Sequence, residues 1–215
     1  GHWFFDDVAL NDSTGSNQTG FPGAGQIVHI KPAAAGDNNA FITQVGGTAG
    51  ASNNFTRVKE VTPDDVTTYN GDVTSGHIDD FALDATPSSI ASGDTINVVM
   101  VGVRYRAVVA GSDAAFKVRI KKVTSSTAIT PASTTWFSNA GAVPHIYPLI
   151  TYQNPDSAAW TKALLDTSQA GYTISTTNTN AADISTLWVS VDSTPAAAPG
   201  NPTVTHLLGS TGVGG

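Results

Sequence analysis

Residues 96–124 read INVVMVGVRYRAVVAGSDAAFKVRIKKVT, and this stretch decides the fold class. Two runs rich in valine and aromatic residues flank the turn sequence AGSD at 110–113, which is typical of two strands joined by a loop. If AGSD closes a four-residue hairpin, Val109 pairs with Ala114, and Tyr105 then lies opposite Val118. Alternate residues of a strand point to opposite faces. The pattern therefore predicts a hairpin with one apolar face.

The same pairing gathers basic side chains on the other face of the hairpin. Six of the ten Lys and Arg residues lie between positions 104 and 122. Like charges directly opposite each other destabilise a sheet, so the pattern predicts carboxylates beside them. A strand at 77–84 could supply these, and the alternative is an anionic ligand or the acidic surface of a neighbour. The expected structural charge cluster or partner contact consists of Arg104, Arg106, Lys117, Arg119, Asp80 and Asp84.

Similar strand-like segments recur along the chain, separated by turns rich in Gly, Pro, Asn and Asp. We expect strands at 3–10, 26–31, 55–61, 77–84, 96–109, 114–124, 146–152, 171–176 and 184–192. The sequence AAAGDNN at 33–39 is expected to interrupt the strands. One helix is expected over about 158–168, capped by Asp156 or Ser157, with Gly171 after its end.

This arrangement predicts an all-β protein: a two-sheet antiparallel β-sandwich of jelly-roll type with one short helix and an extended C-terminal arm. We expect one sandwich domain at 1–192 and a Pro/Ala/Gly-rich arm at 193–215. The arm contains TVTHLL at 203–208, which could add an edge strand to a neighbouring molecule. The residues expected to act in assembly are Val204, His206, Leu207 and Leu208.

Composition narrows the functional classes. Charged residues make up 13% of the chain and the net charge is −7, which argues against non-specific nucleic-acid binding. No apolar run approaches the roughly 18 residues of a membrane span, so we expect no membrane partner. The chain has no cysteine, which excludes disulfides and thiolate metal sites. We expect no cofactor.

The sequence offers no clear catalytic constellation. A β-sandwich glycosidase needs a pair of carboxylates that face one substrate, and Glu60 is the single glutamate of the chain. The adjacent aspartates at 6/7, 64/65 and 79/80 would point to opposite faces of a strand. The chain also lacks a G-x-S-x-G motif, and its five histidines are scattered. We therefore expect no enzyme and no metal, with a calcium site at Asp6, Asp7 and Asp12 as the weak alternative.

Several segments, in order along the chain, resemble structural proteins of tailed phages with LamG-like or concanavalin-like jelly-roll character. These are WFFDDVALND, GQIVHIKPAAAGDNNAF, VTPDDVTTYN, GHIDDFALD, TTWFSN, IYPLITYQNPDSAAWT and ISTLWVSVD. The resemblance covers most of 3–192 and carries over no catalytic residue. It implies a virion protein on the particle surface, extracellular after release, that contacts other virion proteins or further copies of itself.

The role implied is a capsid decoration, head-fibre or minor tail component that acts in assembly and surface display. The alternative is a carbohydrate-binding module for host glycans. Such a module needs exposed aromatic side chains, and the candidates are Trp136, Phe137 and Tyr152. Aromatic residues also dominate sandwich interiors, so each candidate could instead belong to the core.

Overall fold

The computed structural model describes residues 25–107, 113–122, 128–130, 135–137, 145–175 and 181–196. Within these residues two antiparallel sheets of six strands each form a β-sandwich, as the sequence predicted. The expected strand at 3–10 and the arm beyond residue 196 lie outside the described residues, as do Asp6, Asp7, Asp12 and the assembly residues Val204, His206, Leu207 and Leu208.

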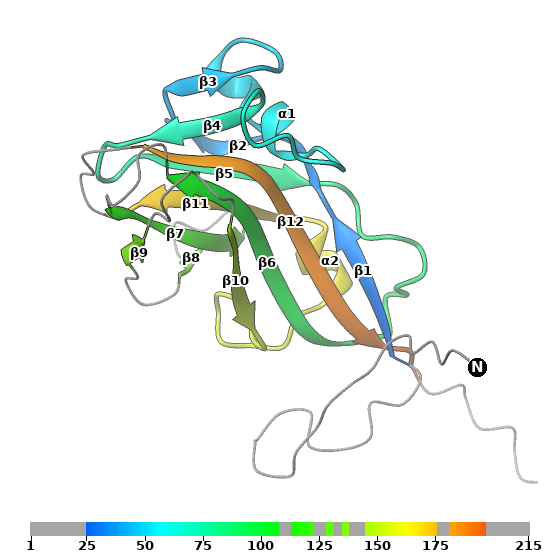
Figure 1. Cartoon of the computed structure of the whole chain (residues 1–215). Coiled ribbons are helices and arrows are strands. Elements are labelled where there is room, and N and C mark those ends of the chain that lie inside the picture. Colours follow the sequence, from blue (N-terminus) through cyan, green and yellow to red (C-terminus); the bar gives the residue numbers. More distant parts are fainter. Residues whose placement is uncertain are drawn as a thin grey trace, which may run out of the picture.

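Sheet A is built around two long neighbouring strands, β6 (Thr95–Ala107) and β12 (Ala182–Thr194). Strand β10 (His145–Thr151) pairs with the free side of β6. Strands β1 (Gln26–Ile30) and β4 (Tyr69–Asp72) share the free side of β12, and β3 (Thr43–Val45) pairs with β4. Figure 1 shows β6 and β12 side by side across this layer.

Sheet B forms the second layer. Its central strand β11 (Ser168–Ile174) lies between β5 (Ile78–Leu83) and β7 (Asp113–Lys122). Strand β2 (Pro32–Asn39) extends the sheet beyond β5. The short strands β8 (Ala128–Ile129) and β9 (Thr135–Phe137) both pair with β7.

The hairpin predicted for 96–124 is wrong. Strands β6 and β7 do not pair with each other; β6 belongs to sheet A and β7 to sheet B. Their apolar faces were identified correctly, because both point into the sandwich, but they meet across the core instead of lying side by side. The rings of Tyr105 and Phe116 pack edge to face with 4.9 Å between their centroids.

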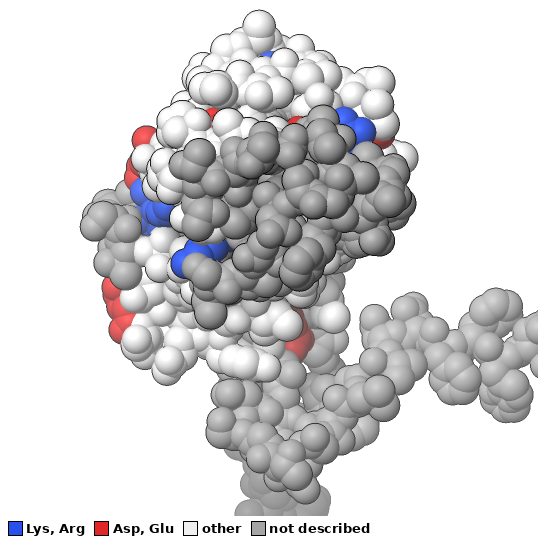
Figure 2. Space-filling model, turned by 60° about the vertical axis from the view of Figure 1, so that its left-hand side comes forward, with Lys and Arg blue, Asp and Glu red and all other residues white. Residues whose placement is uncertain are grey.

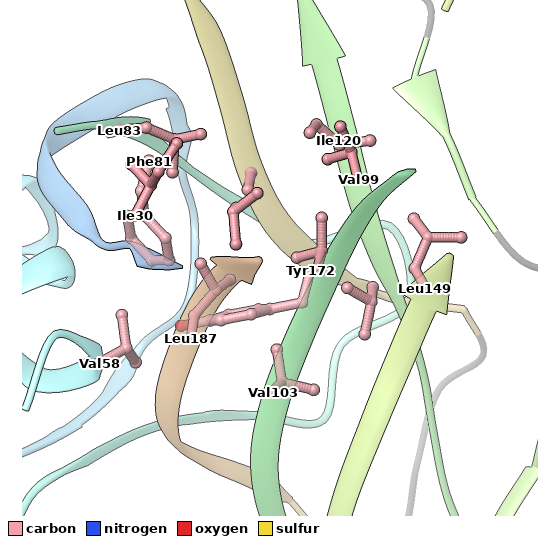
Figure 3. Close-up of a cluster of buried hydrophobic side chains, with 14 of the residues drawn as sticks. Ile30, Val58, Phe81, Leu83, Val99, Val103, Ile120, Leu149, Tyr172 and Leu187 are labelled. Carbon is pink, nitrogen blue, oxygen red and sulfur yellow. The ribbon is translucent and has the colours of Figure 1, made fainter. Parts of the chain in front are cut away.

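The core lies between the two sheets. Val99, Val101 and Val103 on β6 are buried, as are Val118 and Ile120 on β7. Tyr172 on β11 is enclosed and packs against Phe41 and Phe81. Figure 3 shows side chains from both layers converging around this tyrosine. Burial of each large side chain stabilises the fold by about 1.5–3 kcal/mol.

Two local predictions were wrong. Residues 55–61 do not form a strand: after a 3-10 turn at Ala51–Asn53, helix α1 runs from Phe55 to Val58. Conversely, residues 33–39 belong to strand β2, which tolerates its glycine because it has register shifts against β5.

The helix expected over 158–168 is shorter than predicted. Helix α2 covers Lys162–Leu165, and the hydroxyl of Thr161 caps it by accepting the N–H of Leu164 at 3.2 Å. Asp156 and Ser157 lie in the preceding turn and do not cap it. No helix among the described residues is long and apolar enough to cross a membrane.

Candidate interaction surface

The predicted charge cluster is divided between the two sheets. Arg104 and Arg106 alternate with buried residues of β6 and lie on the outer face of sheet A. Lys117 and Arg119 alternate with buried residues of β7 and lie on the outer side of sheet B. The prediction of a single basic face was therefore wrong, because it depended on pairing β6 with β7. On the face drawn in Figure 2, the charged atoms of the described residues form small islands among uncharged ones.

Arg104 is held by a carboxylate that the sequence did not suggest. Its Nε lies 2.7 Å from Oδ1 of Asp65, and its Nη2 lies 2.5 Å from Oδ2. Asp65 has a left-handed backbone with φ of 57° and also accepts the hydroxyl of Ser185. Ser185 lies at a register shift of β12, which turns it toward Asp65. The hydrogen bond from Arg104 lowers the pKa of Asp65.

Arg106 is held by Asp183 of the neighbouring strand β12. Its Nη2 lies 3.2 Å from Oδ2 of Asp183, and its guanidinium lies 5.0 Å from the ring centroid of Tyr69. Burial raises the pKa of Asp183 to about 6, and the charge of Arg106 opposes this effect. Both outward arginines of sheet A are therefore neutralised within the molecule.

Arg119 and Lys121 of sheet B also lie beside carboxylates. Nε of Arg119 lies 3.0 Å from Oδ1 of Asp80 without hydrogen-bond alignment, so this contact is electrostatic. Lys121 lies 2.5 Å from Asp37, which also accepts the side-chain amide of Gln169 at 3.0 Å. Arg119 and Lys121 are nearly buried. Burial raises the pKa of Asp80, while the charge of Arg119 opposes this change.

The other proposed site residues are dispersed. Asp84 is exposed, directly after the end of β5, and neither it nor Lys117 takes part in the ion pairs found among the described residues. Tyr152 follows β10 and is 43% exposed. Trp136 and Phe137 belong to β9, but their side chains lie outside the described set.

A buried polar group lies at one end of the core, around Asp79. Its carboxylate accepts the N–H of Phe41 at 3.0 Å and the side-chain amide of Asn54 at 2.7 Å. Burial raises the pKa of Asp79 to about 6. Such a shift often accompanies catalysis, but Asp79 and Asn54 are enclosed and their bonds hold neighbouring loops in place. We assign this group a structural role.

The described residues contain no group of three or more His, Cys, Asp or Glu side chains that could hold a metal ion. Asp79 and Asp80 show why two adjacent carboxylates on a strand do not contribute to one such group. As expected for neighbours on a strand, they point to opposite sides of sheet B, one toward Phe41 in the core and the other toward Arg119.

The outer face of sheet A carries an exposed apolar area that the sequence reasoning missed. On β10, Ile146 is 60% exposed and Ile150 is 53% exposed, whereas Leu149 between them is buried. Residues paired across antiparallel strands share a face. We therefore assign six residues of β6, β10 and β12 to this area, named the sheet A patch: Val98, Met100, Ile146, Pro148, Ile150 and Trp188.

The centre of the sheet A patch is a row of three paired residues. Pro148 on β10 lies opposite Gly102 on β6, and Gly102 lies opposite Trp188 on β12. A Cβ at position 102 would lie 2.3 Å from Cζ2 of Trp188. The indole therefore lies against the glycine, which leaves room for it on the sheet.

One sequence signal could have identified this patch. In IYPLI at 146–150, both alternating sets of positions are apolar or aromatic, although a strand on the surface of a sandwich needs only one apolar face. The second set, Ile146, Pro148 and Ile150, faces away from the core. An exposed apolar area of this kind is a candidate interaction site.

The fold and this surface define the class: an all-β sandwich whose outward arginines are paired internally and whose outer sheet face is partly apolar. No family model matches the chain, and no curated protein matches it.

Proposed function

We propose that this protein is a non-enzymatic structural component of a tailed-phage particle, such as a capsid decoration, head-fibre or minor tail protein. Its role is assembly and display on the particle surface. The proposal is supported by the resemblance of the ordered segments between 3 and 192 to such proteins. It also agrees with the character of the described surface.

The observation that carries the proposal is the sheet A patch. An exposed apolar area on a rigid sheet gains free energy by leaving water, at roughly 25 cal/mol for each Å² buried. The neighbouring Arg104 and Arg106 are already paired with Asp65 and Asp183. This surface is therefore better suited to contact with another protein than to charge recognition or chemistry.

The test is the presence of the protein on particles. In the phage or prophage that encodes it, we expect the protein to co-purify with particles through a density gradient and to be labelled on their surface by specific antibodies. A deletion strain provides the control for antibody specificity. Purified particles that contain none of the protein would refute the proposal.

A second candidate is glycan binding, favoured by the position of Trp188. Its indole lies over Gly102, and no hydrogen-bond partner for its Nε1 is found among the described residues. A flat indole can stack against a sugar ring, and its N–H can donate a hydrogen bond to one of the sugar hydroxyls. Tyr152, near the end of β10, could extend such a platform.

A glycan array separates the two candidates. If the glycan function holds, the wild-type protein binds a defined set of sugars, and Trp188→Ala abolishes this binding. Ile42→Ala, at an exposed apolar position outside the patch, is the control and should bind normally. Absence of binding by the wild-type protein would eliminate this candidate.

A further inference from the structure

We propose that the chain forms an internal crosslink, an amide bond between Nζ of Lys121 on β7 and Cγ of Asp37 on β2. The two residues are 84 positions apart. Strands β5 and β11 lie between β2 and β7 in sheet B, so the bond would fasten β2 across the outer face of this sheet. This one-time reaction of the chain with itself goes beyond the proposed function and does not depend on it.

A bulge in β2 carries Asp37 over the outer face of sheet B. Residues 36–38 stand opposite Asp80 alone, because the pairing of β2 with β5 shifts there. A Cβ at Gly36 would lie 2.6 Å from Oε1 of Gln169 on β11, so the bulge lies directly against this side chain. The N–H of Asp37 donates to that Oε1 at 3.0 Å, and Nε2 of Gln169 donates to Oδ1 of Asp37 at 3.0 Å. These two hydrogen bonds hold Asp37 above β11, the neighbour of β7.

Lys121 brings an amine to this carboxylate. Its Nζ lies 2.5 Å from Oδ2 of Asp37. Groups held in contact within one molecule react as if at concentrations of about 10⁵ M or more, provided that they are well oriented. The Lys121 side chain is 5% exposed, so the amine is shielded from water, whereas the Asp37 side chain is 47% exposed. This exposure gives the water released by the reaction a route out.

The resting pair is ionic, so the reaction needs a neighbouring group that moves protons. The hydrogen bond from Lys121 lowers the pKa of Asp37, and a protonated amine has no lone pair with which to attack. Asp80 is fully buried, and its Oδ2 lies 3.9 Å from Nζ of Lys121. Nδ2 of Asn38 donates to the same Oδ2 at 2.5 Å, which fixes the carboxylate beside the amine. Burial raises the pKa of Asp80, although the charge of Arg119 opposes this, and a raised pKa suits a group that accepts and returns protons near neutral pH.

The reaction balances as a condensation. Asp80 takes one proton from the ammonium of Lys121, and the freed lone pair forms the N–Cγ bond with Asp37. Asp80 then passes this proton to the departing oxygen of Asp37. The second nitrogen proton moves to the same oxygen, the Cγ–Oδ2 bond breaks, and one water leaves. Nitrogen keeps its third hydrogen in the amide, Asp80 returns to its starting state, and no oxidant or reductant takes part.

A second lysine–aspartate contact provides an internal control. Lys122, the next residue of β7, contacts Asp156 through its amine. Its side chain is 27% exposed and less shielded than that of Lys121. Among the ion pairs of the described residues Lys122 has this one aspartate, so no second carboxylate is paired with it to move protons. We therefore expect Lys122 to keep a free amine.

Mass spectrometry of the purified full chain in denaturant tests the inference. We expect an intact mass below that of the sequence by one water molecule, and a branched tryptic peptide that joins Lys121 to Asp37. Trypsin should fail to cleave after Lys121 and should cleave after Lys122. A chain of full sequence mass, or a branch at Lys122 instead, would overturn the inference. Loss of ammonia with Lys121 joined to Asn38 would also overturn it, because Asp37 would not be the partner.

Matched variants test each role. Lys121→Arg and Asp37→Ala should each have the full sequence mass, whereas Lys122→Arg should lose one water as the wild type does. Asp80→Asn should form the crosslink at least about tenfold more slowly, measured by mass at intervals after cell-free synthesis. Circular dichroism checks that this variant folds, and an unchanged rate would remove Asp80 from the reaction. The wild-type mass decides the inference even if Asp80→Asn does not fold.

Discussion

Asp79 and Asp80 show how strongly the environment of a side chain changes between neighbouring residues of a strand. Asp79 accepts hydrogen bonds from Asn54 and a backbone N–H within the core, and it forms none of the ion pairs found among the described residues. Burial raises its pKa to about 6. Asp80 lies against Arg119 on the other side of the same sheet. Asp183 of sheet A combines both conditions, since it is buried and paired with Arg106.

These shifts predict a stability that depends on pH. The pKa of Asp183 is about 6 in the folded protein and near its ordinary 3.8 in the unfolded chain, so the folded state binds the proton more tightly. The stability contributed by this group is therefore complete below 3.8 and is lost as the pH rises through about 6. Asp65 has a lowered pKa and acts in the opposite direction, as stability is lost when the pH falls below its ordinary value.

The variant Asp183→Asn should reduce the decline in stability between about pH 4 and about pH 7, because the amide keeps an acceptor for Arg106 but does not titrate. Part of the decline should remain, because Asp79 also has a pKa raised to about 6. Urea denaturation at a series of pH values measures this slope. Asp84→Asn, at an exposed position, serves as the control and should retain the wild-type slope. An unchanged slope in Asp183→Asn would assign the pH dependence to other groups.

Gly171 is required by close packing of backbones. A Cβ at this position would lie 1.9 Å from the carbonyl oxygen of Asp79, in the middle of sheet B. We therefore expect Gly171→Ala to lower the free energy of unfolding by about 2–3 kcal/mol. A Cβ at Gly93 would make an ordinary contact at 3.6 Å, so Gly93→Ala should be nearly neutral. Denaturant melts that rank the two variants equally would contradict this account.

At the scale of elements, the sequence predicted long strands well and short elements poorly. The alternation in β5, β6, β7 and β12 repeats over enough residues to specify both the strand and its buried face. Residues 55–61 carry apolar side chains at every third position, which fits a helix better than a strand, and in α1 Arg57 is buried and bonded to the preceding loop. Local patterns do not encode such tertiary contacts.

The prediction of a single charge cluster was wrong for a related reason. The hairpin rule assumes that neighbouring strands pair, whereas β6 and β7 belong to opposite sheets. The prediction of nearby carboxylates depended less on topology, and Asp80 does lie beside Arg119. Asp65 and Asp183 could not be foreseen, because long-range pairing brings them to Arg104 and Arg106.

Helix α1 and the loop before it should depend on Arg57. Its guanidinium donates to the carbonyls of Gly46 at 2.9 Å and Thr48 at 2.5 Å, and to the side chain of Asn54 at 3.2 Å. Arg57→Ala leaves these acceptors without a donor and should cost about 2–4 kcal/mol in urea denaturation. Arg57→Lys should recover only part of this stability, because an ammonium cannot reproduce the guanidinium fork.

The control for Arg57 is Lys59→Ala, which removes an exposed cation just after the same helix. It should change stability by no more than about 1 kcal/mol, since it removes an exposed cation–π contact with Phe55 at 5.1 Å. If both alanine variants were equally stable, the carbonyl contacts of Arg57 would not hold this loop.

At the scale of the whole molecule, the strand pairings found among the described residues end at Thr194, where β12 ends, before the C-terminal arm. Deleting residues 197–215 should therefore shift the melting temperature by less than about 2 °C. If the arm acts in assembly, the same deletion should abolish incorporation into particles. A truncated chain that is incorporated normally would exclude that role for the arm.

The pairing of β1 with β12 has a consequence for synthesis. Gln26 lies opposite Ser193, so a strand near the beginning of the described residues is completed by one near their end. Strand β12, which lies near the end of the described residues, also pairs with β6 along its length. During translation β1 and β6 therefore lack their pairing partner, and their apolar side chains stay exposed, until residues 182–194 leave the ribosome. We therefore expect the domain to complete its fold only after residues 182–194 have been synthesised, with the slow kinetics typical of high contact order.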